Sequence, residues 1–264
     1  MNISTASMSR QGARASNQDQ TGESIGERAA CFVVCDGIAG LPGGDVAAEL
    51  ARNAIITRFD GDQHLNAQYI REYIYEANNA IRTEQKAAEQ FQRMGTTMVS
   101  LFIDRDYHLA YWVHAGDSRL YLFRRGWLYH VTTDHSLVQQ MKDAGHQTDG
   151  INSNLLYFAL GLGDDEREAS YSDVVPIEDG DVFLLCTDGF WHGVSEEQMK
   201  QSLHMVNTPH EWLTLMNQIL LRTNVESRDQ QDNYSAVAVW VGAPQDTTLL
   251  HSLAQASQFF PLRD

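Results

Sequence analysis

The spacing of apolar residues along the chain predicts four helices. Two long segments repeat apolar positions every three or four residues, which is the spacing of one helix face. Two later helices each begin at a capping-box pattern, Ser195 with Gln198 and Thr208 with Glu211. The four predicted helices cover residues 46–59, 65–91, 195–204 and a segment that starts at 209.

Short apolar runs bounded by turn residues predict strands. Four of these runs follow one another with short connections, a spacing typical of an antiparallel meander. Because strands and helices come in groups rather than in strict alternation, we predict an α+β fold in which helices cover sheets. The meander covers residues 97–103, 107–114, 118–123 and 127–131, and further strands cover 30–35, 181–187 and 234–241.

The lack of linker-like segments along the chain indicates a single domain. The 264 residues include only five prolines, and no low-complexity stretch or linker divides them. One polar, loop-like stretch runs from about residue 145 to 154. We predict a domain over residues 1–242 and a C-terminal tail over 243–264.

Charge and composition limit the partners and the compartment. With 19 Lys and Arg against 35 Asp and Glu, the net charge is −16, which argues against nucleic-acid and anionic-membrane partners. The sequence has no apolar run long enough to span a membrane, and we expect no signal peptide. Cys31, Cys35 and Cys186 lie in apolar runs, so we expect buried free thiols and a reducing, cytoplasmic location.

Aspartates recur at the ends of the predicted strands. Asp36, Asp117 and Asp188 each follow an apolar run, and Asp232 precedes one. A single such aspartate is usually a turn residue, but antiparallel pairing would bring four of them to one rim of the sheets. Grouped carboxylates repel one another, and oxygen ligands favour Mg²⁺ or Mn²⁺. Two such ions would suit hydrolysis of a phosphoester.

Other candidate motifs give weaker evidence of a catalytic or binding role. The glycine-rich segment 37–44 matches neither a dinucleotide-binding motif nor a P-loop, which argues against a nucleotide hydrolase. We interpret His135 as a capping residue at a helix start. His192, four residues after Asp188, is a weaker candidate for proton transfer.

An ordered set of eight motifs resembles the metal-dependent serine/threonine protein phosphatases, the PPM or protein phosphatase 2C family. The resemblance covers about residues 9–241 and implies a four-layer sandwich, with two central antiparallel β-sheets flanked by α-helices and metals in a cleft at one end. The motifs are Arg14–Asp19, Asp36–Gly40, Met94–Thr97, Ala115–Arg119, Thr133–Ser136, Ala159–Gly161, Thr187–Gly189 and Asp232–Asn233. We expect Met94–Thr97 to serve packing and a turn.

The resemblance implies a cofactor of two Mn²⁺ or Mg²⁺ ions. Asp36 is expected to bridge the two ions, and the carbonyl of Gly37 is expected to bind one of them. Asp188 and Asp232 are expected to complete the other ion's ligands, and Asp19 to contact metal-bound water.

The resemblance also implies roles around the two ions. Arg14 is expected to hold the substrate phosphate. Asp117, together with Asp188, is expected to line a third, weaker metal site. A mobile flap is expected within about residues 133–160, which includes the polar loop.

Two residues depart from the family pattern. Gln18 stands where many members have Glu, which predicts weaker binding of the second ion. Ile38 stands where eukaryotic members often have a proton-donating His, so the sequence does not identify the general acid.

The expected function is hydrolysis of phosphoserine and phosphothreonine on proteins by a metal-activated water. Such an enzyme would oppose a bacterial Ser/Thr kinase, and regulation of type VI secretion is one setting for it. The alternative is a pseudophosphatase that binds phosphoproteins without turning them over, which Gln18 and Ile38 favour but the retained aspartates oppose.

Overall fold

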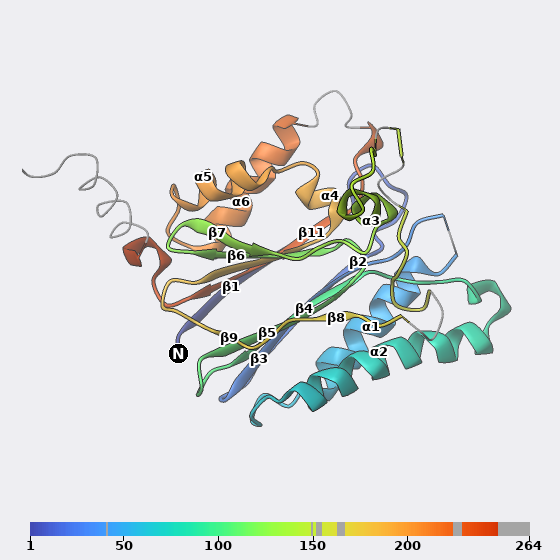
Figure 1. The fold of residues 1–264 in the computed structure, drawn as a ribbon, viewed down its shortest axis with the longest axis horizontal. Helices are drawn as coiled ribbons and strands as arrows, with labels where there is room; N and C mark the ends of the chain where they lie inside the picture. Colours follow the sequence, from blue (N-terminus) through green and yellow to red (C-terminus); the bar gives the residue numbers. More distant parts are fainter. Residues whose placement is uncertain (41, 149, 152–154, 163–166, 224–228, 248–264) are drawn as a thin grey trace, which may run out of the picture.

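Two antiparallel sheets packed face to face form the centre of the computed structural model, which describes residues 1–40, 42–148, 150–151, 155–162, 167–223 and 229–247 (Figure 1). The first sheet has five strands in the order β1-β11-β10-β6-β7. Its strands are β1 (Ile3–Arg10), β11 (Tyr234–Val241), β10 (Val182–Cys186), β6 (Arg119–Arg124) and β7 (Trp127–Val131).

The second sheet has the strand order β2-β3-β4-β5-β8, and β9 also pairs with β5. Its strands are β2 (Asp19–Ile25), β3 (Ala29–Asp36), β4 (Met98–Asp104), β5 (Leu109–Ala115), β8 (Ser170–Tyr171) and β9 (Val175–Pro176). Strands β3 and β4 are apolar along their length because both of their faces are covered.

Helices cover the outer face of each sheet, which confirms the predicted four layers (Figure 1). The second sheet is covered by α1 (Gly44–Arg58) and α2 (Ala67–Ala87), and the first by α4 (Asp188–Trp191), α5 (Glu196–Leu203) and α6 (Pro209–Thr223). A shorter helix, α3 (Leu137–Asp143), follows β7, and the 3₁₀ turn η1 (Glu89–Phe91) follows α2. The predicted helix over 65–91 is therefore an α-helix and a separate 3₁₀ turn.

Side-chain alternation divides the interior into three apolar clusters. Phe32 and Val34 of β3 point between the sheets, whereas Cys31 and Val33 point toward α1 and α2. All three cysteines are buried free thiols, as predicted, and burial raises the pKa of each. The clusters hold the layers in fixed positions, so the loops at the sheet ends are anchored on a packed scaffold.

The predicted meander is wrong as a single sheet. Strands β4 and β5 pair in the second sheet, while β6 and β7 pair in the first. Between β5 and β6 the chain crosses from one sheet to the other through Gly116, whose φ is 96°. Each of the four strands was predicted. Their spacing did not indicate that the short turn between β5 and β6 leads from one sheet to the other.

Strands β1 and β2 were not predicted. Their sequences are rich in Ser, Thr and Gly, and each lies at the edge of its sheet, where few side chains are buried. The strand conformation of β1 is stabilised by its pairing with β11 along Ile3–Arg10, and not by local sequence preference.

The capping role predicted for His135 is also wrong. Ser136 is the N-cap of α3, and its side chain accepts a hydrogen bond from the Gln139 amide. His135 is buried, where its Nδ1 accepts from the Gly116 amide at 3.2 Å and its Nε2 lies 2.8 Å from Ser170 Oγ. The capping box at Ser195 and Gln198 is present as predicted.

The predicted flap and tail are only partly described. Within 133–160 the structure shows α3 and a bridge between Ser136 and Leu156, while residues 149 and 152–154 lie outside the described residues. Of the tail, residues 243–247 are described and 248–264 are not. In the described parts of the chain, every helix is too short or too polar to cross a membrane.

Candidate active site

A polar cleft of about 320 Å³ opens at the end of the sandwich where β3 and β10 finish and β11 starts. It brings together six of the seven predicted site residues, and the seventh, Asp19, is buried beside Asp36, its partner in the β2–β3 pair. The cleft is lined by Arg14, Ala15, Ser16, Gln18, Asp36, Gly37, Ile38, Ala39, Gly40, Thr97, Asp117, Leu156, Asp188, Asp232 and Asn233.

Asp19 and Asp36 face each other across the β2–β3 pair, where they are register partners. Asp36 is the last residue of β3 and partly exposed to the cleft, whereas Asp19 is 3% exposed. Asp19 Oδ2 accepts a hydrogen bond from Thr187 at 3.0 Å, but Asp19 Oδ1 has no partner despite its burial. An unpartnered buried carboxylate oxygen is costly unless a donor or a cation reaches it.

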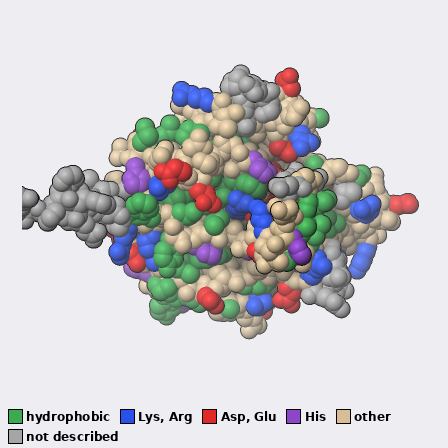
Figure 2. Space-filling view, turned by 45° about the horizontal axis from the view of Figure 1, so that its top comes forward, with side chains coloured by type: hydrophobic (Ala, Val, Ile, Leu, Met, Phe, Trp, Pro, Cys, Tyr) green, Lys and Arg blue, Asp and Glu red, His purple; other side chains and the backbone are tan. Residues whose placement is uncertain are grey.

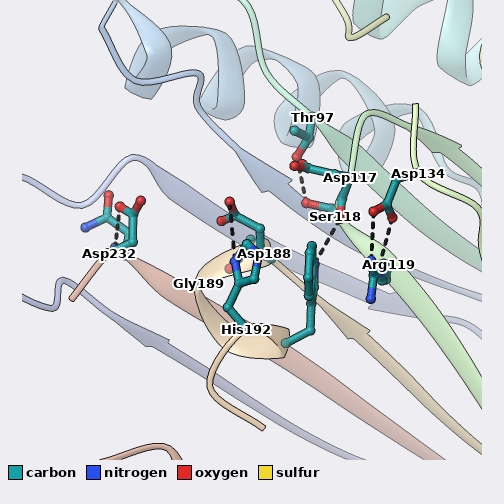
Figure 3. A network of polar contacts seen from close by, with 12 residues as sticks. Thr97, Asp117, Ser118, Arg119, Asp134, Asp188, Gly189, His192 and Asp232 are labelled. Atoms are coloured by element: carbon teal, nitrogen blue, oxygen red, sulfur yellow. Dashed lines mark hydrogen bonds and ion pairs between the residues drawn. The ribbon is translucent and has the colours of Figure 1, made fainter. Parts of the chain in front are cut away.

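Asp117 is held by a tight turn next to Thr97. Thr97 Oγ1 lies 2.6 Å from Ser118 Oγ (Figure 3). It also accepts from the Asp36 amide at 3.1 Å, so one side chain connects the two aspartate-bearing turns. A Cβ on Gly116 would approach the Thr97 side chain to 2.7 Å, so only glycine fits. Thr97 therefore serves turn structure, as predicted for the Met94–Thr97 motif.

Burial leaves these carboxyl groups hard to ionise. Burial first, and then neighbouring aspartates, raises the pKa of Asp36 well above its usual value. Burial likewise raises the pKa of Asp19 to about 7 and that of Asp117 to about 8, and it raises the pKa of Asp188. The cleft thus concentrates acid groups that repel one another as anions.

Arg14 is the one Lys or Arg among the described residues that line the cleft. Its guanidinium donates to Asp232 Oδ2 at 2.6 Å, a contact that raises the pKa of Arg14, and its side chain is 47% exposed. A half-exposed arginine at the cleft wall can turn toward an incoming anion.

Asn233 holds the loop that carries Arg14. Its Oδ1 accepts from the Gln18 amide at 2.9 Å, and its Nδ2 donates to the carbonyls of Gln11 at 2.6 Å and Ser16 at 3.0 Å. Asn233 is 5% exposed, so these three bonds form a buried clamp. Asn233 belonged to a quoted motif, but sequence reasoning gave it no role.

A second support connects Asp117 with the helix that starts at Asp188. Trp191 Nε1 donates to the Asp117 carbonyl at 3.0 Å, and the Arg119 guanidinium lies 3.5 Å from the Trp191 ring centre. Arg119 is fixed in turn by two hydrogen bonds to Asp134, at 2.8 and 2.7 Å (Figure 3). Sequence reasoning missed this support because it depends on a ring contact between distant segments.

The remaining predicted positions lie as follows. Gln18 and Ile38 both line the cleft, and Ile38 brings no titratable group to it. His192 Nδ1 lies 4.0 Å from Asp188 Oδ2, with the side chain 46% exposed and outside the cleft lining (Figure 3). Among the described residues, no three Asp, Glu, His or Cys side chains already form one metal coordination shell.

The donor chemistry of the cleft nevertheless fits divalent cations. Asp36, Asp117, Asp188 and Asp232 supply oxygen donors to one cleft, and Asp19 Oδ1 is an unsatisfied acceptor behind it. Hard divalent cations such as Mg²⁺ and Mn²⁺ prefer such donors.

Comparisons with known proteins agree with the geometry. The sequence profile of the family described as protein phosphatase 2C matches residues 7–231. The serine/threonine phosphatase stp of Listeria monocytogenes is 31% identical over 189 residues, covering 68% of this chain and 73% of that protein.

Solved structures share the fold. The catalytic domain of the serine/threonine protein phosphatase PstP, crystallised with two manganese ions, is 28% identical with a TM-score of 0.75, covering 91% of this chain and 98% of that one. PppA, a regulatory component of type VI secretion in Pseudomonas aeruginosa, is 24% identical with a TM-score of 0.73, over 91% of this chain and 98% of its own, and shows the fold alone. The chain is therefore a member of the protein phosphatase 2C family and a bacterial-type serine/threonine protein phosphatase.

Proposed function

We propose that this enzyme removes phosphate from phosphoserine and phosphothreonine in proteins, using two divalent cations held by the carboxylates of the cleft. The observation that carries the proposal is the gathering of Asp36, Asp117, Asp188 and Asp232 on one cleft with a single arginine, Arg14. A crowded set of carboxylates beside one guanidinium suits a phosphate that arrives with cations.

Asp36, Asp188 and Asp232 are the proposed ligands, together with the Gly37 carbonyl, and Asp19 supports them from behind. Mn²⁺ or Mg²⁺ bound there would supply a nucleophilic water at neutral pH and neutralise charge on the phosphoryl group. Asp117, beside Asp188, is the proposed ligand of a third, weaker ion.

Arg14 is the proposed phosphate-binding residue. Its ion pair with Asp232 holds the guanidinium over the cleft, and its 47% exposure leaves donors free for phosphate oxygens. The Asn233 clamp holds the backbone of the loop from which the Arg14 side chain extends.

The substrates are proposed to be products of a bacterial Ser/Thr kinase in the cytoplasm, a compartment that fits three buried free thiols. Participation in type VI secretion stays a narrower prediction, since the likeness to PppA concerns the fold alone.

The test is release of phosphate from a phosphothreonine peptide, measured with Mn²⁺, with Mg²⁺ and with a chelator. We expect turnover that needs a divalent cation and that is lost when Asp36→Asn and Asp188→Asn are combined. Turnover that survives chelation or the double variant would contradict the proposal.

Calorimetry on the same peptide separates the pseudophosphatase alternative. Saturable binding of metal and phosphopeptide with no phosphate release, in protein shown to be folded, would favour a binding protein over an enzyme.

A further inference from the structure

A second cavity, of about 480 Å³, lies on the open edge of the sandwich, between β7 of the first sheet and β5, β8 and β9 of the second. Its walls are largely aromatic and include Trp112, Tyr129, Tyr157 and Tyr171. Its size and its mixture of aromatic and polar walls are those of small-molecule sites. It contains none of the residues of the active-site cleft.

Two stacked histidines lie in its wall, where burial favours their neutral form. The rings of His114 and His135 stack with centroids 4.5 Å apart. His135 Nδ1 accepts from the Gly116 amide, so its Nε2 carries the hydrogen and donates to Ser170 Oγ. His114 Nε2 lies 2.8 Å from the Thr133 carbonyl and is likewise the donor. Burial lowers the pKa of His114 and lowers that of His135 to about 4.

Three hydroxyl groups of the wall act as acceptors within the protein and keep an O–H hydrogen that can be donated. Ser170 Oγ accepts from His135, Ser172 Oγ accepts from the Trp112 amide at 2.9 Å, and Thr132 Oγ1 accepts from the Leu120 amide at 3.1 Å. Because each oxygen already accepts an N–H from the protein, each O–H hydrogen is available to a ligand that brings acceptors.

Charge restricts the ligand further. Among the described residues, no Lys or Arg lines the cavity, and its carboxylate is the exposed Asp173. The arginines that pack on its walls already have partners: Arg71 lies over the Tyr171 ring and pairs with Glu168, and Arg124 lies over the Tyr129 ring and pairs with Asp181. Arg167 lies over the Tyr157 ring and donates to the Tyr157 carbonyl. A phosphate or carboxylate would have to compete with these contacts, and the chain's net charge of −16 would oppose a polynucleotide. On the face that Figure 2 shows, acidic and basic side chains are interspersed rather than gathered into one patch. The ligand should therefore be uncharged, planar and rich in ring acceptors.

We propose that this cavity binds an uncharged nitrogen heterocycle of the purine-nucleoside class. The ring would stack on the aromatic walls, its ring nitrogens would accept from Ser170 and Ser172, and an exocyclic amino group would donate to Asp173. The proposed site adjoins the active cleft through the Gly116–His135 hydrogen bond, since Asp117 follows Gly116, and through the neighbours Leu156 and Tyr157.

The test is calorimetric titration of the folded chain with adenosine, with ribose as the probe that lacks the ring. It needs neither metal nor phosphopeptide, so its result is independent of the proposed phosphatase reaction. We expect saturable 1:1 binding of adenosine and none of ribose.

Variants locate the binding. Tyr129 is 61% exposed at the rim, so Tyr129→Ala should fold and yet bind adenosine roughly tenfold more weakly. The matched control is Tyr107→Ala, an equally exposed tyrosine outside the cavity lining, which should bind as the unmodified chain does. Loss of one donor in Ser172→Ala should weaken binding several-fold. The proposal is overturned if adenosine gives no saturable binding at millimolar concentration, if ribose binds equally, or if Tyr129→Ala binds as Tyr107→Ala does.

Discussion

Two sets of buried or half-buried aspartates in this molecule have opposite surroundings. Asp181 and Asp134 are each held by a two-pronged arginine: Arg124 bonds both oxygens of Asp181 at 2.8 Å, and Arg119 bonds both oxygens of Asp134. In contrast, Asp19, Asp36 and Asp117 form no ion pair within the described part of the chain.

The difference separates structural acids from acids that await a cation. A buried carboxylate with its own arginine has its charge balanced by the fold. A group of buried carboxylates without one needs protons or a cation from solution to balance its charge. Substitution of one aspartate in each set should therefore have opposite consequences for activity and stability.

The largest expected effect is on catalysis. Asp36→Asn should lower metal-dependent turnover of a phosphothreonine peptide by about 10³-fold or more, because the variant loses the carboxylate proposed to bind both cations. Asp181→Asn, assayed well below its melting temperature, should turn over the peptide as the unmodified enzyme does. Equal loss in the two variants would remove the distinction between the sets.

The next effect is on stability, where Asp181→Asn should be more damaging than Asp36→Asn. Asp181→Asn removes the charge that two Arg124 nitrogens bond, leaves Arg124 with Glu178 at 3.2 Å, and should cost about 2 kcal/mol of unfolding free energy. Asp36→Asn removes a charge that burial disfavours, so in chelator its unfolding free energy should be unchanged or higher. Denaturant unfolding of both variants in chelator measures this, and a large loss in Asp36→Asn would contradict it.

Added metal should stabilise only through the cleft set. Mn²⁺ at about 100 times its dissociation constant should raise the unfolding free energy by about 2.7 kcal/mol. The gain should persist in Asp181→Asn, starting from its lower baseline, and shrink in Asp188→Asn. Thermal melts with and without Mn²⁺ provide the measurement, and an undiminished gain in Asp188→Asn would place the metal elsewhere.

A smaller effect should follow from removing the hydrogen bonds that hold the loop of Arg14, the arginine of the cleft. Asn233→Ala removes the clamp on the Arg14 loop and should lower kcat/KM by about tenfold to a hundredfold, because Arg14 is misplaced. Exposed Asn207, replaced by Ala, is the control and should leave kcat/KM unchanged. Rates alike in the two variants would show that the clamp does not position Arg14.

The smallest effect should come from adding one more acid to the uncompensated set. Gln18→Glu supplies a further carboxylate at the cleft and should tighten the weaker Mn²⁺ by about fivefold, since cation affinity rises with ligand charge. Calorimetric titration with Mn²⁺ measures this, with Gln20→Glu as a control outside the cleft lining. Weaker binding in Gln18→Glu would mean that repulsion outweighs coordination.

The sequence anticipated the fold where local signals were strong. Continuous apolar runs revealed β3, β4 and β10, and capping patterns located α5 and α6. Polar edge strands β1 and β2 carry no such signal because long-range pairing orders them. The sheet change at Gly116 was hidden because a three-residue turn is compatible with either partner sheet.

The gathering of the aspartates in one cleft was anticipated because strand ends are fixed by the apolar runs that precede them. Asp36 and Asp188 follow from this rule, and the family resemblance added Arg14 and Asp19. Contacts between segments far apart in sequence could not be predicted. Examples are the Asn233 clamp and the Trp191–Arg119 stack. These contacts exist only after the sheets have paired.

The pairing of β1 with β11 has a consequence for how the enzyme is made. Arg14 follows β1 and Asp232 precedes β11, so their 2.6 Å contact forms only when strands more than two hundred residues apart have joined. During synthesis, β3, β4 and α1 can pack while the ribosome is still translating, but β1 cannot pair in the first sheet until its neighbour β11 has been made. A nascent chain therefore gains its activity in one late event, and an interrupted product that ends before residue 232 carries an incomplete cleft.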